Sequence, residues 1–198
     1  SIDRKELLRV LCPGGTAVTL DSGLKTLDSF RKPWPAEIDQ WTHYLHGPDN
    51  NAVSRDSVVG PPRHFQWISQ PRFSRSHDHL ASVSAVVSSG GRLFSIVDQG
   101  SIAFAAASPR WRLVARDAFN GLLLWEREIS SWEYHLRDFR SGPADIARRL
   151  VAVDDRVYVI LDIDGPTQVL DAATGETRAT CAGSEFTREI VLSDKVAF

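Results

Sequence analysis

Five of the six histidines in the chain lie in one segment, residues 41–81. Imidazole nitrogen is a good ligand for zinc, copper or iron. The spacing groups four of these residues into two pairs and makes them candidate metal ligands: His43, His46, His77 and His79. H-x-x-H and H-x-H spacings in loops enforce no metal geometry, and histidines beside aromatic and amide residues commonly fix irregular backbone by hydrogen bonds. The segment therefore supports three hypotheses: a metal site, a structural role, and contact with a ligand.

The remaining reactive side chains form no recognisable catalytic pattern. Cys12 and Cys181 lie far apart and outside any zinc, iron–sulfur or haem-attachment spacing. The sequence Asp162-Ile163-Asp164 resembles the start of a calcium loop, but the Gly-Pro that follows favours a plain turn. No Ser-His-Asp or Cys-His constellation follows from spacing. We therefore predict no catalytic residue and regard enzymatic activity of this chain alone as the weaker hypothesis.

Bulk properties exclude some partners. The formal net charge of the 198 residues is -2, which gives no concentrated basic face for nucleic acid. No apolar run approaches the roughly 20 residues that a membrane-spanning helix needs. The chain starts at Ser1 and contains no methionine, so we interpret it as processed or as an excerpt of a longer protein.

The N-terminal third contains little regular structure. Residues 1–20 predict a short helix stopped by Pro13-Gly14-Gly15 and followed by a strand over 16–20. Residues 21–40 have neither helical nor strand periodicity, which predicts a linker. The His-rich segment 41–81 is irregular, with one predicted strand at Phe65–Ile68.

From residue 82 onward the sequence is typical of an all-β protein. Short runs rich in Val, Ile, Leu and aromatics alternate with Gly, Asp and Asn turns and predict four hairpins. The hairpins are repeats, and a period near forty with four strands per copy indicates β-propeller blades. We expect a partial β-propeller of four-stranded antiparallel blades with a short N-terminal α/β extension. Two blades, a truncated third and their ranges follow from the repeats: 82–132, 150–183 and 189–198.

One turn carries a specific motif, Ala-x-Asp-x-x-x-Gly-x-x-x-Trp, at Ala115, Asp117, Gly121 and Trp125. An Asp can accept from the N–H groups of the turn it opens, Gly can adopt positive φ, and Trp can fill the gap between blades. The second copy keeps two of the four residues, Asp171 and Gly175. It has Val169 and Ala179 in place of the Ala and the Trp.

This motif resembles the tryptophan docking motif of propellers of the pyrroloquinoline-quinone (PQQ) type. The longer stretch 41–156 looks like a group of bacterial PQQ-like-repeat proteins, many of them predicted to be exported, which implies a periplasmic or exported location. Residues 6–15 resemble the late helix and strand of a class I methyltransferase, whose cofactor loop would lie upstream.

The resemblance implies a non-catalytic propeller module for protein or ligand binding, with other blades or another chain as partner. The alternative is the N-terminal part of a PQQ-dependent oxidoreductase, which would bind PQQ with calcium. A quinone slot of that kind needs a stacking tryptophan, and three are candidates: Trp67, Trp111 and Trp132. The adjacent cysteines common in such dehydrogenases are absent from the sequence.

Overall fold

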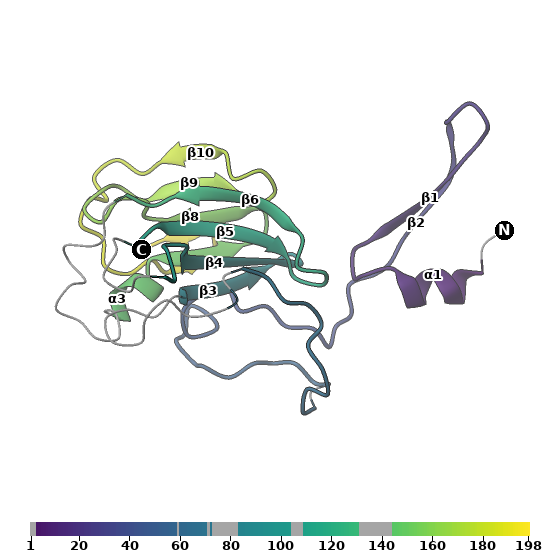
Figure 1. Cartoon of the computed structure of the whole chain (residues 1–198), viewed down its shortest axis with the longest axis horizontal. Helices are drawn as coiled ribbons and strands as arrows, with labels where there is room; N and C mark the ends of the chain where they lie inside the picture. The colour runs from purple at the N-terminus through teal and green to yellow at the C-terminus, as the bar shows by residue number, and fades with distance from the viewer. Residues whose placement is uncertain (1–2, 59, 71, 73–82, 104–108, 131–143) are drawn as a thin grey trace. The chain divides into compact units, whose positions relative to one another are not determined.

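The computed structural model describes residues 3–58, 60–70, 72, 83–103, 109–130 and 144–198 (Figure 1). The chain divides into two compact units. Unit 1 comprises residues 1–39 and 55–61, and unit 2 comprises residues 40–54 and 62–198. None of the described helices is long and apolar enough to cross a membrane.

Unit 1 contains helix α1 (Arg4–Val10) and a hairpin of β1 (Thr16–Leu20) and β2 (Thr26–Arg31). Asp3 caps the helix, since its carboxylate accepts from the Lys5 N–H at 3.0 Å. At the other end, the Lys32 ammonium donates to the carbonyl oxygens of Leu8 and Leu11, both at 2.7 Å. These contacts satisfy helix-end groups that the helix itself leaves unpaired.

The prediction of a linker over residues 21–40 is wrong for its first half, because β2 occupies Thr26–Arg31 and pairs with β1. Strand periodicity is missing from the sequence because almost every side chain of β2 is exposed and needs no apolar alternation. The turn is fixed instead by Asp21, whose carboxylate accepts from the N–H groups of Gly23 and Lys25.

Unit 2 is mostly β, with two four-stranded antiparallel sheets and a third hairpin (Figure 1). The first sheet holds, in spatial and chain order, β3 (Val83–Ser89), β4 (Arg92–Asp98), β5 (Trp111–Asp117) and β6 (Leu123–Glu128). After the short helix α3 (Ala144–Ala147), the second sheet holds β7 (Leu150–Val153), β8 (Arg156–Val159), β9 (Gln168–Asp171) and β10 (Thr177–Thr180). The third hairpin is β11 (Leu192–Ser193) with β12 (Val196–Ala197).

Strands β7, β8 and β9 of the second sheet are buried on both faces, whereas β10 is exposed. Its side chains Leu150, Val157 and Leu170 belong to one core cluster that also contains first-sheet residues such as Phe94. The alternate side chains form a second cluster with residues next to the third hairpin: Val151, Tyr158, Ile160, Val169 and Ile190. Two buried faces explain why β7 and β8 are continuous apolar runs, whereas a strand with one solvated face alternates.

The segment Phe65–Ile68, predicted as a strand, is not one. Phe65 and Ile68 are 85% and 68% exposed. Side chains hold the segment: Trp67 Nε1 donates to the Ala118 carbonyl at 3.0 Å, and Gln66 Nε2 donates to that of Phe119. A short apolar run does not distinguish a strand from such an anchored loop, because periodicity needs a longer window.

Three consecutive residues of the His-rich segment, Trp41, Thr42 and His43, connect three β-hairpins. These are β3–β4, β7–β8 and β11–β12. We call the three residues the clasp. The Trp41 carbonyl accepts from the Ser88 N–H of β3 at 2.7 Å, and the Thr42 carbonyl accepts from the Ala152 N–H of β7 at 3.0 Å. His43 Nε2 accepts from the Leu192 N–H of β11 at 3.1 Å.

The three N–H donors to the clasp occupy the same position in their hairpins. In each hairpin a two-residue turn joins the two strands, and the donor is the second residue before that turn. The donors pair across the hairpin as follows: Ser88 with Leu93, Ala152 with Val157, and Leu192 with Ala197. The clasp therefore contacts successive copies of one repeat at an equivalent atom. Leu192 of the third copy of the repeat therefore corresponds to Ala152 of the second copy.

Candidate functional site

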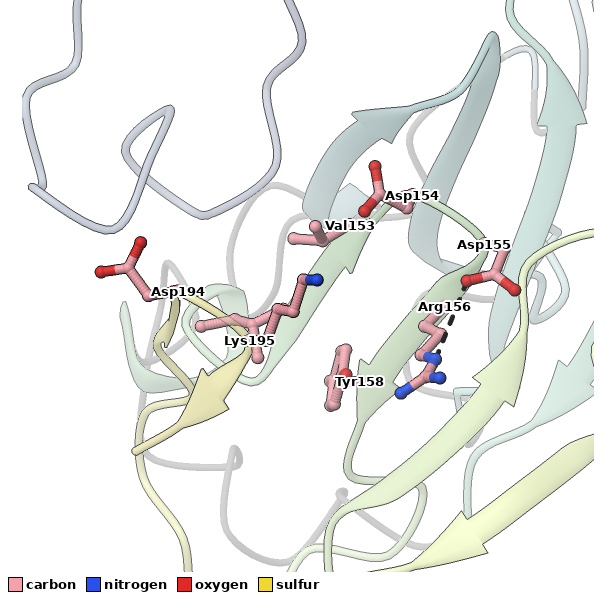
Figure 2. A pocket seen from close by; sticks show the side chains of 8 residues that line it. Val153, Asp154, Asp155, Arg156, Tyr158, Asp194 and Lys195 are labelled. Atoms are coloured by element: carbon pink, nitrogen blue, oxygen red, sulfur yellow. Dashed lines mark ion pairs between the residues drawn. The ribbon is translucent and has the colours of Figure 1, made fainter.

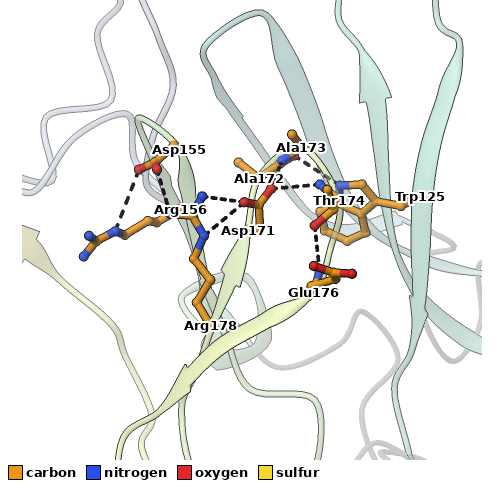
Figure 3. Close-up of polar contacts among 9 residues, drawn as sticks. All are labelled: Trp125, Asp155, Arg156, Asp171, Ala172, Ala173, Thr174, Glu176 and Arg178. Atoms are coloured by element: carbon orange, nitrogen blue, oxygen red, sulfur yellow. Dashed lines mark hydrogen bonds and ion pairs between the residues drawn. The ribbon is translucent and has the colours of Figure 1, made fainter.

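The tryptophan of the sequence motif lies where the first and second sheets meet (Figure 3). Trp125 of β6 is buried, and its Nε1 donates to the Ala172 carbonyl of the second sheet at 3.1 Å. A Cβ atom added to Gly175 would approach the Trp125 ring to 2.6 Å, so the indole lies directly on this glycine. Phe94 packs against the same indole, with ring centroids 5.8 Å apart. Ala115 pairs with Trp125 across the strands and, being small, leaves room for this packing.

The two Asp-to-Gly turns have the same hydrogen bonding. Asp117 Oδ1 accepts from the N–H groups of Phe119 and Asn120, at 2.8 and 3.0 Å. Asp171 Oδ1 accepts in the same way from Ala173 and Thr174, at 2.7 and 2.9 Å. Each turn closes at a glycine with φ of +74°, Gly121 and Gly175. All six predicted motif residues thus take part in these turns or in the packing around Trp125.

An arginine fixes the second of these turns to the neighbouring hairpin (Figure 3). Arg178 donates to the carboxylate of Asp171 through Nε, at 3.0 Å, and through Nη2. Its Nη1 donates to Asp155 at 2.6 Å. The Arg178 guanidinium, helped by the backbone N–H groups of the turn, lowers the pKa of Asp171 to about 2. The same guanidinium lowers the pKa of Asp155.

A second indole makes the contact that Trp125 makes, one sheet earlier. Trp67 donates from Nε1 to the Ala118 carbonyl, and a Cβ atom added to Gly121 would approach its ring to 2.6 Å. Trp67 was a candidate for stacking on a quinone, and the structure instead places it in protein packing. The signal in the sequence was the spacing, since Trp67 precedes Gly121 by 54 residues and Trp125 precedes Gly175 by 50. Trp67 lies in a loop and Trp125 lies in β6, so an alignment of strands does not match the two residues.

The second sheet carries no tryptophan at the equivalent edge position. Val169 pairs with Ala179 in β9 and β10, as Ala115 pairs with Trp125 in β5 and β6. Ala179 is exposed. On the same face, Tyr158 occupies the place of Phe94, since the two residues have matching registers in β8 and β4. The aromatic pair of the first sheet is therefore reduced to one ring in the second sheet.

A pocket of about 300 Å³ lies between the β7–β8 turn and the β11–β12 turn (Figure 2). Its apolar walls are Val153, Tyr158 and Leu192. Its charged walls come from both turns and are Asp154, Asp155, Arg156, Asp194 and Lys195. A concave site with an apolar wall and a few charged groups is the usual form of a small-molecule site.

The charged groups of the pocket differ in how far the protein neutralises them. Asp155 accepts from Arg178 and lies 3.7 Å from Arg156 Nε. Asp194 accepts a long 3.4 Å bond from the hydroxyl of its neighbour Ser193. Within the described part of the chain, Asp154 and Lys195 form no side-chain hydrogen bond or ion pair, either with each other or with a third residue.

His43 and His46, the first pair of metal candidates, are both buried and serve local structure. Because His43 Nε2 accepts from Leu192, the proton of the neutral ring is on Nδ1, which donates to Thr42 Oγ1 at 2.7 Å. Thr42 Oγ1 donates onward to the His46 carbonyl at 3.2 Å. Both ring nitrogens of His43 are thus committed to protein partners, which favours the structural hypothesis at this residue.

The other chemical candidates contribute less. His77, His79 and Trp132 lie outside the described residues. Among the residues that are described, no three His, Cys, Asp or Glu side chains gather into a possible metal site. Cys12 and Cys181 are both free thiols.

Neither a family model nor a curated protein matches this chain. Three features of the chain itself define the candidate site: two repeated tryptophan–glycine contacts, a clasp across three hairpins, and a charged pocket beside Tyr158.

The contact between Trp125 and Gly175 has a matched control in Gly183. Both glycines have positive φ, +74° and +77°, but nothing lies within 4 Å of a Cβ atom at Gly183. Gly183→Ala should cost about 1 kcal/mol of unfolding free energy through backbone strain alone. Gly175→Ala should cost about 2–5 kcal/mol, because it adds a clash with the indole. Urea denaturation measures both, and equal losses would show that the indole contact is unimportant.

Burial lowers the pKa of His43 below its ordinary value of 6.5, an effect that the carboxylates of Asp49 and Glu189 only partly oppose. The folded state therefore binds this proton less readily than the unfolded state does. Stability should be complete above pH 6.5 and should fall as the pH drops below it, by at most about 1.4 kcal/mol per pH unit. Unfolding free energies measured between pH 8 and pH 5 test this. His43→Gln should flatten the dependence, and an unchanged slope in that variant would contradict the assignment.

Proposed function

We propose that this chain forms consecutive blades of a PQQ-like β-propeller and acts as a non-catalytic module that binds a protein or a small ligand. The observation that carries the proposal is the repeated seam. Trp67 contacts Ala118 and Gly121 in the way that Trp125 contacts Ala172 and Gly175. A contact of one kind repeated from sheet to sheet is what radial stacking of blades requires.

The arrangement of the strands supports the same proposal. Each four-stranded sheet is a meander, and the first strand of each, β3 or β7, contacts the clasp. In a propeller the first strand of each blade lines the central axis, so the clasp would lie at that axis. Rings contain roughly four to eight blades, so further blades, from the same protein or from another chain, would complete the ring and are the expected partners.

The rival function, a PQQ-dependent oxidoreductase, has less support from the residues present. A quinone slot needs an exposed indole face, but Trp67 packs on Gly121 and Trp111 is 3% exposed. The well-defined contacts of unit 2 are architectural, and function in such folds depends on sites added to the scaffold. The pocket beside Tyr158 is the site that best fits a binding role.

Two features of the proposal rest on the resemblance of the sequence. Residues 1–20 have the helix-then-strand order of the late part of a class I methyltransferase, and we interpret them as a remnant of such a domain. The exported or periplasmic location likewise follows from the resemblance alone.

Titration of the purified chain with PQQ and calcium distinguishes the binding module from the oxidoreductase. We expect no saturable change in quinone absorbance and no stoichiometric heat of binding, because the two described candidate indoles, Trp67 and Trp111, are engaged in packing. The same titration with calcium alone is the control for nonspecific effects. Reproducible one-to-one binding of PQQ would overturn the module proposal in favour of the oxidoreductase.

A further inference from the structure

The turns that line the pocket hold charged residues in a backbone conformation that suits glycine. Asp154, Asp194 and Lys195 have φ of +53°, +49° and +68°. The equivalent turn of the first sheet uses Gly90 and Gly91, with φ of +58° and +75°. L-residues are disfavoured in this region, lysine more than aspartate. Strained residues of this kind cluster at functional sites, and here they bring charge to a pocket.

Two of these charges are opposite in sign, exposed, and without a protein partner in the described chain. The Lys195 ammonium and the Asp154 carboxylate both line the pocket, and in the described chain neither has an ion-pair partner (Figure 2). Asp155 is already neutralised by Arg178. A ligand with only one charge would leave either Lys195 or Asp154 unmatched. A ligand with both charges would satisfy the two residues together.

The apolar wall of the pocket includes one aromatic side chain, Tyr158, which is 9% exposed. Tyr158 holds the position at which Phe94 packs against Trp125 in the first sheet, and position 179 supplies only a methyl group in place of that indole. Val153 and Leu192 extend the wall on either side. An aromatic ring of a ligand would contact the part of Tyr158 that lines the pocket, together with Val153 and Leu192.

We propose, building on the binding-module function, that the pocket binds a small zwitterion with an apolar side chain, of the class of the aromatic α-amino acids. The ligand carboxylate pairs with Lys195, the ligand ammonium pairs with Asp154, and the ring lies against Tyr158. A volume of about 300 Å³ is at the lower end for small-molecule sites and suits a ligand of this size.

Three related probes separate the charges: L-phenylalanine, 3-phenylpropionate without the amine, and 2-phenylethylamine without the carboxylate. Isothermal titration of the whole chain should give one-to-one binding of L-phenylalanine with a Kd on the order of 0.1–1 mM. Each single-charge probe should bind roughly tenfold more weakly, because it forms one of the two ion pairs instead of both.

Two variants assign each charge to its residue. Lys195→Asn and Asp154→Asn remove the charges, and asparagine tolerates positive φ, so both variants should fold. Lys195→Asn should weaken L-phenylalanine and 3-phenylpropionate about tenfold and leave 2-phenylethylamine unchanged. Asp154→Asn should weaken L-phenylalanine and 2-phenylethylamine instead. Lys25→Asn, which removes a lysine from unit 1, is the matched control and should change nothing.

Several outcomes would overturn this assignment. They are the absence of saturable L-phenylalanine binding up to about 10 mM, equal binding of all three probes, and affinities unaffected by either variant in a folded protein. None of these outcomes touches the module proposal, which would fail through stoichiometric binding of PQQ. The two titrations therefore report separately on the ligand class and on the function of the module.

Discussion

The structure of unit 2 depends on burying both faces of strands β7, β8 and β9 in its second sheet. A four-stranded sheet with two apolar faces is unstable in water, because each face needs a partner layer. The first sheet covers one face through the cluster that contains Phe94 and Trp125, and the other face packs near the third hairpin. The clasp then fixes the three hairpins at one common position by consecutive acceptors, two carbonyl oxygens and the imidazole of His43.

The clasp explains how a hairpin as short as β11–β12 is held. Two strands of two residues bury little surface and are marginal alone. The bond from Leu192 to His43 is joined by one from the Ile190 N–H to the Arg148 carbonyl at 3.0 Å. Arg148 also pairs with Glu189 at 2.5 Å and lies over the Tyr44 ring. Long-range contacts thus supply what the hairpin lacks in local pairing.

Much of the β structure could be predicted from the sequence. Strongly apolar runs between Gly and Asp turns locate the hairpins because both the strand pattern and the turn chemistry are local. Strand β2 escaped prediction because an exposed hairpin strand needs no apolar periodicity. Phe65–Ile68 was wrongly predicted as a strand because its residues are mostly apolar. In the structure the segment is a loop that places the indole of Trp67 on Gly121.

The candidate site was harder to predict than the fold, because its parts come from different repeats. The Asp and Gly residues of the motif are visible at a fixed spacing, and their turn geometry follows from residue type. The role of His43 depends on Leu192, which lies far along the chain, and no local spacing encodes that contact. The pocket combines the β7–β8 turn with the β11–β12 turn, which belong to different repeats, so no local pattern encodes it.

The difference between the two turn pairs bears on why the chain would keep strained charges. Gly90 and Gly91 form the turn of the first sheet without a steric penalty, so the repeat can adopt the favourable solution. Asp194 and Lys195 form the corresponding turn of the third hairpin with both residues at positive φ. Replacing them with glycine would relieve strain, yet it would also remove charge from the wall beside Tyr158. The ligand site proposed above would have this combination of features, because functional sites often keep strained groups at a cost in stability.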